Sequence, residues 1–114
     1  MEKLKFKLKT NDEYIIDVEV PYFIKEDVLN FSIDNNIYRY NINKKILNKE
    51  NNESIMNIDM INNEILYVYK SLNKEFKLPI DNNKLSNNGN FIVYEYEIKD
   101  NNIINIIEIT YWHH

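Results

Sequence analysis

The chain of 114 residues contains no cysteine, one glycine and two prolines. Without cysteine, neither a disulfide framework nor a metal site built on thiolates is available. The single glycine, Gly89, excludes the glycine-rich loops that hold phosphate groups. No apolar run approaches the about 20 residues of a membrane-spanning helix, and the N-terminal MEKLKFKLK lacks the apolar core of a signal peptide. These absences predict a cytoplasmic protein that does not enter a membrane.

Histidine is also scarce, because the two histidines of the chain are the adjacent His113 and His114. A histidine-based catalytic triad and a zinc site built from several imidazoles are therefore excluded. The terminal pair, residues 113–114, is typical of a flexible tail or of the remains of a purification tag. The serines have no base at a recognisable spacing, so we expect no enzyme, no metal and no cofactor. The net charge of −4 argues against nucleic acid as a partner.

Apolar and polar residues alternate along most of the chain, which is typical of β-strands with one buried face. Polar pairs punctuate this alternation at Asn35–Asn36, Asn62–Asn63 and Asn101–Asn102. Asparagine tolerates the positive φ that a tight hairpin turn requires, so we expect these pairs to be turns. The polar segments 43–54 and 81–90 are expected to be long loops.

Residues 1–112 are therefore expected to form a single all-β domain, a small antiparallel meander β-barrel of about 8–9 strands. Short connections favour antiparallel pairing of neighbouring strands, and a barrel covers the apolar face while limiting exposed edges. A two-sheet β-sandwich is the alternative.

Two-residue turns would also determine which residues face one another across each hairpin. The predicted pairs are Phe6–Ile16, Tyr22–Phe31, Phe31–Tyr40, Ile58–Tyr67, Tyr67–Ile80 and Tyr94–Ile109. On the outer face the same rule sets Glu95 opposite Glu108, two carboxylates that we interpret as part of a solvated surface. In these registers no charged residue falls within the paired inner runs.

All nine tyrosines point to the inner face in these registers. Buried tyrosine hydroxyls need hydrogen-bond partners, and a core otherwise made of aliphatic side chains supplies few. Either the rings fill the core with their hydroxyls toward the rim, or they line a pocket for a small flat ligand. The residues expected to line such a pocket are Tyr38, Tyr40, Tyr67, Tyr69, Tyr94 and Tyr96.

The outer face carries a second candidate site, a partly apolar patch. Its members are Phe91, Ile104, Ile106 and Trp112. Such a patch is expected to contact a protein partner, a second copy of the chain, or one of the long loops. The lysine stripe of Lys3, Lys5, Lys7 and Lys9 is interpreted as a solubilising edge.

Three segments carry a likeness to a known family. They are VPYFIKEDVLNFSID (20–34), SIMNIDMINNEILYVYKSLNKEF (54–76) and FIVYEYEIKDNNIINIIEITY (91–111). In its tyrosine-bearing second strand, its middle hairpin and its closing hairpin, the chain resembles a small uncharacterised bacterial family of calycin-like β-barrels. The resemblance implies a calycin-like barrel with ligand binding, and it implies no catalytic residues.

Two functions are therefore expected. The first is a non-enzymatic barrel that binds a small apolar or aromatic ligand among the inward tyrosines. The alternative is a protein-interaction module, such as an inhibitor, immunity or counter-defence protein, that acts through its outer face and the loops 43–54 and 81–90.

Overall fold

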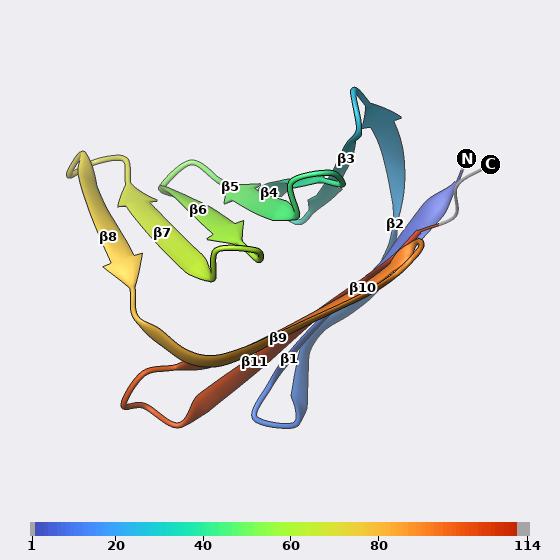
Figure 1. Cartoon of the computed structure of the whole chain (residues 1–114). Helices are drawn as coiled ribbons and strands as arrows, with labels where there is room; N and C mark the ends of the chain where they lie inside the picture. The colour runs from blue at the N-terminus through green and yellow to red at the C-terminus, as the bar shows by residue number, and fades with distance from the viewer. Residues whose placement is uncertain (1, 112–114) are drawn as a thin grey trace. The chain divides into compact units, whose positions relative to one another are not determined.

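The computed structural model describes residues 2–111 and shows an all-β chain of eleven strands (Figure 1). The strands are β1 (Lys3–Thr10), β2 (Glu13–Lys25), β3 (Val28–Ile33), β4 (Asn36–Asn41), β5 (Ile46–Glu50), β6 (Ser54–Asp59), β7 (Glu64–Tyr69), β8 (Lys74–Leu78), β9 (Ile80–Asn88), β10 (Phe91–Ile98) and β11 (Ile103–Thr110). Within residues 2–111 there is no helix that is long and apolar enough to cross a membrane.

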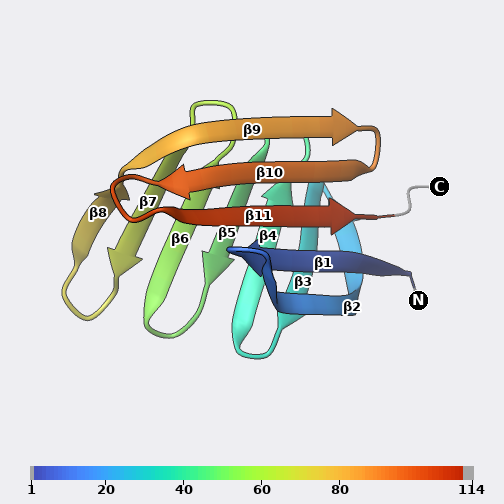
Figure 2. The same cartoon turned by 90° about the horizontal axis from the view of Figure 1, so that it is seen from below.

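Every strand pairs with its neighbours in antiparallel fashion, in the order β8-β7-β6-β5-β4-β3-β2-β1-β11-β10-β9. The chain divides into two compact units, which comprise residues 1–21 with 80–114 (unit 1) and residues 22–79 (unit 2). Strand β2 belongs to both, because its first part pairs with β1 and its last part with β3. In unit 1, β9, β10, β11 and β1 lie side by side (Figure 2). The all-β antiparallel fold predicted from the alternation is confirmed.

Unit 1 has one apolar face because its strands place apolar residues in register. Phe6 lies opposite Ile109, and Ile109 lies opposite Ile92 on the other side of β11. The next row joins Ile107 to Tyr94. All five side chains are buried, whereas the lysines of β1 occupy the opposite face.

Unit 2 builds its apolar face from two continuous rows of side chains. The first row runs Ile24, Leu29, Tyr40, Leu47, Ile58, Ile65 and Leu78. The second row runs Tyr22, Phe31, Tyr38, Lys49, Met56, Tyr67 and Phe76. Directly opposed residues share a face of an antiparallel sheet, so both rows lie on the same side. Leu29, Tyr40 and Ile65 are fully buried, which makes this face the core of the unit.

Asparagine and aspartate turn the chain where other proteins use glycine. Ten described non-glycine residues have positive φ, and eight of them are Asn or Asp. These residues adopt the left-handed conformation at lower cost than other L-residues, because their short polar side chains can hydrogen-bond locally. The exceptions are Glu26 (φ 52°) and Lys45 (φ 58°).

The predicted faces are correct for most strands, but most of the predicted partners are wrong. Tyr94 lies opposite Ile107 rather than Ile109, and Ile58 lies opposite Ile65 rather than Tyr67. The other corrected pairs are Phe6–Val18, Phe31–Tyr38 and Tyr67–Phe76, whereas Tyr22–Phe31 is confirmed. In each wrong pair the observed partner is an even number of residues away from the predicted one, so every side chain keeps its face. Loops longer than two residues, such as 60–63 and 99–102, account for two of these shifts.

Both segments predicted to be long loops contain strands. Residues 46–50 form β5 within the segment 43–54, and β9 spans most of the segment 81–90. Residues 2–111 therefore form eleven strands instead of the expected 8–9. Strand β9 escaped recognition because its residues are mostly exposed, so no apolar alternation marks it.

The expectation that all nine tyrosines point inward is wrong for Tyr14. An irregularity in the β1–β2 register between Leu8 and Lys9 sets Tyr14 opposite Lys9. The ammonium groups of Lys7 and Lys9 lie 5.7 and 5.3 Å from the centre of its ring. Tyr14 is thus a cation–π partner of the lysine stripe on the outer face, and it is 51% exposed.

Candidate functional site

A hollow lined by aromatic side chains lies in unit 2, on strands β7 and β8. It has a volume of about 260 Å³. Its lining residues, which we call the aromatic cleft, are Tyr67, Tyr69, Phe76, Lys77 and Leu78. Tyr69 and Phe76 are 43% and 44% exposed, so their rings remain accessible.

The three rings of the cleft hold one another at defined angles. Tyr67 lies directly opposite Phe76 across the β7–β8 pair. The ring centres of Tyr67 and Tyr69 are 5.1 Å apart at 49°, and those of Tyr69 and Phe76 are 5.9 Å apart at 80°. Such tilted and edge-to-face contacts are favourable for aromatic pairs. They leave ring faces and edges available to a flat ligand.

Polar contacts fix both ends of this arrangement. The hydroxyl of Ser54, a buried residue of β6, donates a hydrogen bond of 3.5 Å to the hydroxyl of Tyr67. At the other end, the ammonium of Lys77, which also lines the cleft, lies 2.9 Å from the carboxylate of Glu64. This exposed ion pair is worth at most about 1 kcal/mol, so it mainly aligns β8 with β7.

The other four predicted ligand-binding tyrosines lie in the cores of the two units. Tyr38 stacks on Phe31 with ring centres 5.0 Å apart and planes 3° apart. Burial, with the nearby charge of Asp34, raises the pKa of Tyr38 to about 12. Tyr40 is fully buried beside it in β4.

In unit 1, Tyr94 and Tyr96 are both buried, with ring centres 5.6 Å apart. Burial, followed by the influence of Tyr94, raises the pKa of Tyr96 to about 12. Of the six predicted tyrosines, Tyr67 and Tyr69 are therefore the ones that the structure brings together around a described hollow.

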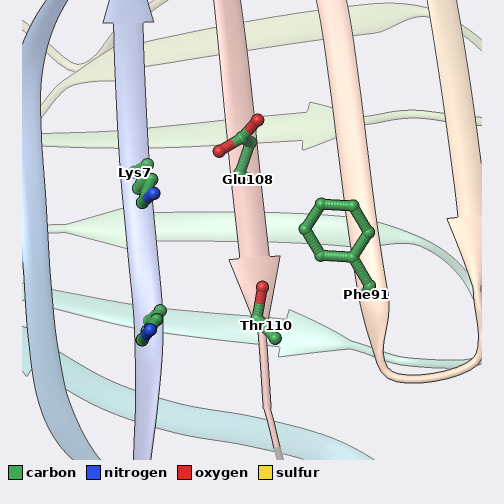
Figure 3. A pocket seen from close by; sticks show the side chains of 5 residues that line it. Lys7, Phe91, Glu108 and Thr110 are labelled. Atoms are coloured by element: carbon green, nitrogen blue, oxygen red, sulfur yellow. The ribbon is translucent and has the colours of Figure 1, made fainter.

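A second hollow, of about 310 Å³, lies on the outer face of unit 1 (Figure 3). It is lined by Lys5, Lys7, Phe91, Glu108 and Thr110. Lys7 lies opposite Glu108, and Thr110 lies between Lys5 and Phe91. The hollow therefore combines both signs of charge, a hydroxyl and one aromatic ring.

The predicted interaction patch overlaps this outer face in part. Phe91 and Ile104 are 40% and 41% exposed, whereas Ile106 is half-buried. Trp112 lies outside the described residues. The patch stays a prediction.

The predicted pairing of two outer carboxylates is wrong. Glu108 lies opposite Val93, and Glu95 lies opposite Ile106, because the β10–β11 register is shifted by two residues. In the part of the chain that the structure describes, no group of three or more potential ligands could hold a metal ion.

Sequence reasoning missed the two charged residues on the apolar face of unit 2. Lys49 of β5 lies opposite Tyr38 on one side and Met56 on the other. Lys74 of β8 lies opposite Tyr69. The statement that the inner runs carry no charge is therefore corrected. The alternation of Leu47 and Lys49 could have revealed the first of them, had β5 been recognised.

Comparison with known proteins finds no matching family model, no similar curated protein and no similar solved structure. The resemblance to calycin-like barrels accordingly stays a prediction.

Proposed function

We propose that this protein is a non-enzymatic binding module that holds a small, flat, apolar or aromatic ligand in the aromatic cleft. The observation that carries the proposal is the exposure of Tyr69 and Phe76, at 43% and 44%, around a hollow of about 260 Å³. Removing apolar surface from water contributes about 25 cal/mol per Å² to the free energy of binding. Exposed rings around a hollow therefore favour an apolar ligand. A ligand of one or two fused rings suits a hollow at the small end of ligand sites.

Aromatic contacts supply enough energy for modest affinity. Each well-oriented ring contact adds about 0.5–1.5 kcal/mol beyond the gain from buried area. With the three rings of the cleft, a bicyclic aromatic ligand is expected to bind with a Kd in the micromolar to millimolar range, about −4 to −8 kcal/mol.

At the level of the fold, we propose a calycin-like barrel located in the cytoplasm. Support comes from the antiparallel meander and from the apolar face within each unit, since such a face must be covered. Cytoplasmic location agrees with a chain that contains no cysteine. An experimentally determined structure is the test: a closed ring of strands supports the barrel, and two separate packed sheets support the sandwich.

The binding proposal is tested with a matched pair of phenylalanine variants. Phe76→Ala removes a ring of the cleft, whereas Phe23→Ala removes a ring that is 61% exposed and lies outside it. Titration with a naphthalene derivative, followed by fluorescence, should show about fivefold weaker binding for Phe76→Ala and no change for Phe23→Ala. Equal effects of the two variants, or no binding to the unmodified protein, would contradict the proposal.

A second candidate function is protein interaction through the outer face of unit 1. It is supported by the exposed Phe91, which lies beside the charged side chains of Lys7 and Glu108. The simplest partner is a second copy of the chain. Sedimentation of the unmodified protein and of Phe91→Asp tests it, because a dimer that the variant dissociates supports this surface. If the protein stays monomeric at all concentrations, the proposal of a homodimer is wrong.

A further inference from the structure

The charged strand residues on the apolar face of unit 2 are all positive. Register places residues from each of the strands β3 to β8 on this face, and all of them are described. The charged residues among them are Lys49 and Lys74. Glu50 and Glu64, acids of the same strands, occupy the opposite face, where they pair with Lys70 and Lys77. The aromatic cleft therefore lies on a positively charged face.

Both lysines are placed close to the cleft. Lys74 lies directly opposite Tyr69 on the neighbouring strand. Lys49 shares a row with Met56 and Tyr67, two strands away from Tyr67. Neighbouring strands are about 4.8 Å apart, so this separation is about 10 Å, and Met56 of β6 stands between the two residues in the row. A lysine stem lying along apolar surface can span part of that distance.

Lys49 brings a positive charge to a partly buried position. The residue is half-buried, and its direct neighbours across the register are Tyr38 and Met56. The ion pairs found among residues 2–111 use other cations, Lys9, Arg39, Lys70 and Lys77. Removing a cation from water costs free energy that only a counter-charge or hydrogen bonds restore. A ligand that brings an anion to this face would restore it.

We propose that the occupant of the aromatic cleft is a flat aromatic acid. Its ring lies against Tyr67, Tyr69 and Phe76, and its carboxylate is bound by Lys49. Lys74, which is exposed, adds a weaker attraction because solvent and salt screen it. This inference rests on the proposed function and adds to it the charge of the ligand.

Two probes of equal shape test the charge. Naphthalene-2-carboxylate carries the anion, and naphthalene-2-carboxamide replaces it with a neutral group. The full chain should bind the carboxylate about fivefold to tenfold more tightly, as expected for one partly shielded ion pair. Raising the salt concentration should reduce this ratio.

Variants then assign the preference to a residue. Lys49→Met should lower the carboxylate-to-amide ratio to about one while the amide still binds, and Lys74→Met should lower it less. Lys44→Met is the matched control, because it removes the same charge from an exposed position in the turn before β5. It should leave the ratio unchanged.

The outcomes separate the two proposals. If the amide binds as tightly as the carboxylate, or if Lys49→Met keeps the preference for the carboxylate, the proposal of an acidic ligand is wrong. The proposal that the cleft binds an aromatic ligand is then still supported. If neither probe binds, the cleft itself is wrong and this inference falls with it.

Thermal unfolding of the free protein gives an independent readout. Because methionine has nearly the volume of lysine and no charge, Lys49→Met should raise the melting temperature by about 2–4 °C, and Lys44→Met should not. A lower melting temperature for Lys49→Met would assign Lys49 a structural role and overturn the proposal.

Discussion

The β2–β3 turn offers a quantitative test of the structure at Glu26. Glu26 and Asp27 have φ of 52° and 63°, which places both in the left-handed region. This conformation costs an ordinary L-residue about 1–2 kcal/mol, because its Cβ approaches the following carbonyl oxygen. Glycine, which has no Cβ, adopts it freely. We predict that Glu26→Gly stabilises the protein.

The size of the effect follows from two opposing terms. Relief of the left-handed conformation gains about 1–2 kcal/mol. The greater freedom of glycine in the unfolded chain removes about 0.5–1 kcal/mol of this gain. Glu26 is exposed, so its side chain loses little packing on replacement. The net stabilisation of about 0.5–1 kcal/mol should raise the melting temperature by about 2–5 °C for a chain of this size.

Thermal unfolding followed by circular dichroism measures the shift, with Glu75→Gly as the control. Glu75 is equally exposed but lies within β8, where its φ is not positive. Glycine there should destabilise by about 0.5–1 kcal/mol, so the two variants should shift the melting temperature in opposite directions. If Glu26→Gly lowers the melting temperature as Glu75→Gly does, the reasoning about the turn is refuted.

Three further predictions concern the core and the titrating groups. Leu47→Ala, in the buried row of unit 2, should destabilise by about 2–5 kcal/mol in urea unfolding, whereas Ile61→Ala, at a residue 57% exposed, should change stability by less than about 0.5 kcal/mol. Burial raises the pKa of Tyr38 from 10.0 to about 12. The protonated hydroxyl of Tyr38 therefore contributes fully to the free energy of unfolding below pH 10, and this contribution is lost as the pH rises through about 12. An alkaline absorbance titration should show the raised pKa. A hydrogen bond from Lys70 holds the pKa of Glu50 below its usual range. The contribution of this contact to stability is therefore present above the pKa of Glu50 in the unfolded chain, and it is lost as the pH falls through the pKa of the folded state. NMR titration should show that Lys70→Met raises the pKa of Glu50.

Alternation determines the face of a residue but leaves its partner open. Tyr94 was expected opposite Ile109 and lies opposite Ile107, on the same face. A strand can slide by two residues without exposing its apolar side, so the pattern constrains only whether the shift is even. The missing information was loop length. The assumed loop length of two residues was correct for Glu26–Asp27, which separate β2 from β3.

Strands with exposed side chains escape prediction for a different reason. Residues of β9 such as Asn82, Asn83 and Asn87 are exposed, so no buried face imposes alternation. Backbone hydrogen bonds to β10 nevertheless hold β9 in the sheet. Those bonds depend on the main chain and are invisible in side-chain composition.

The candidate site depends on position in the strand order, which alternation does not report. Tyr40 and Tyr67 share the apolar face of unit 2, yet Tyr40 is fully buried in β4 while Tyr67 lines a hollow next to the edge strand, β8. Distinguishing them requires the number of strands on each side, and hence the recognition of β5. The same strand brings Lys49 onto this face. The proposal of an acidic ligand depends on this cation, which lies in a segment whose polarity suggested a loop.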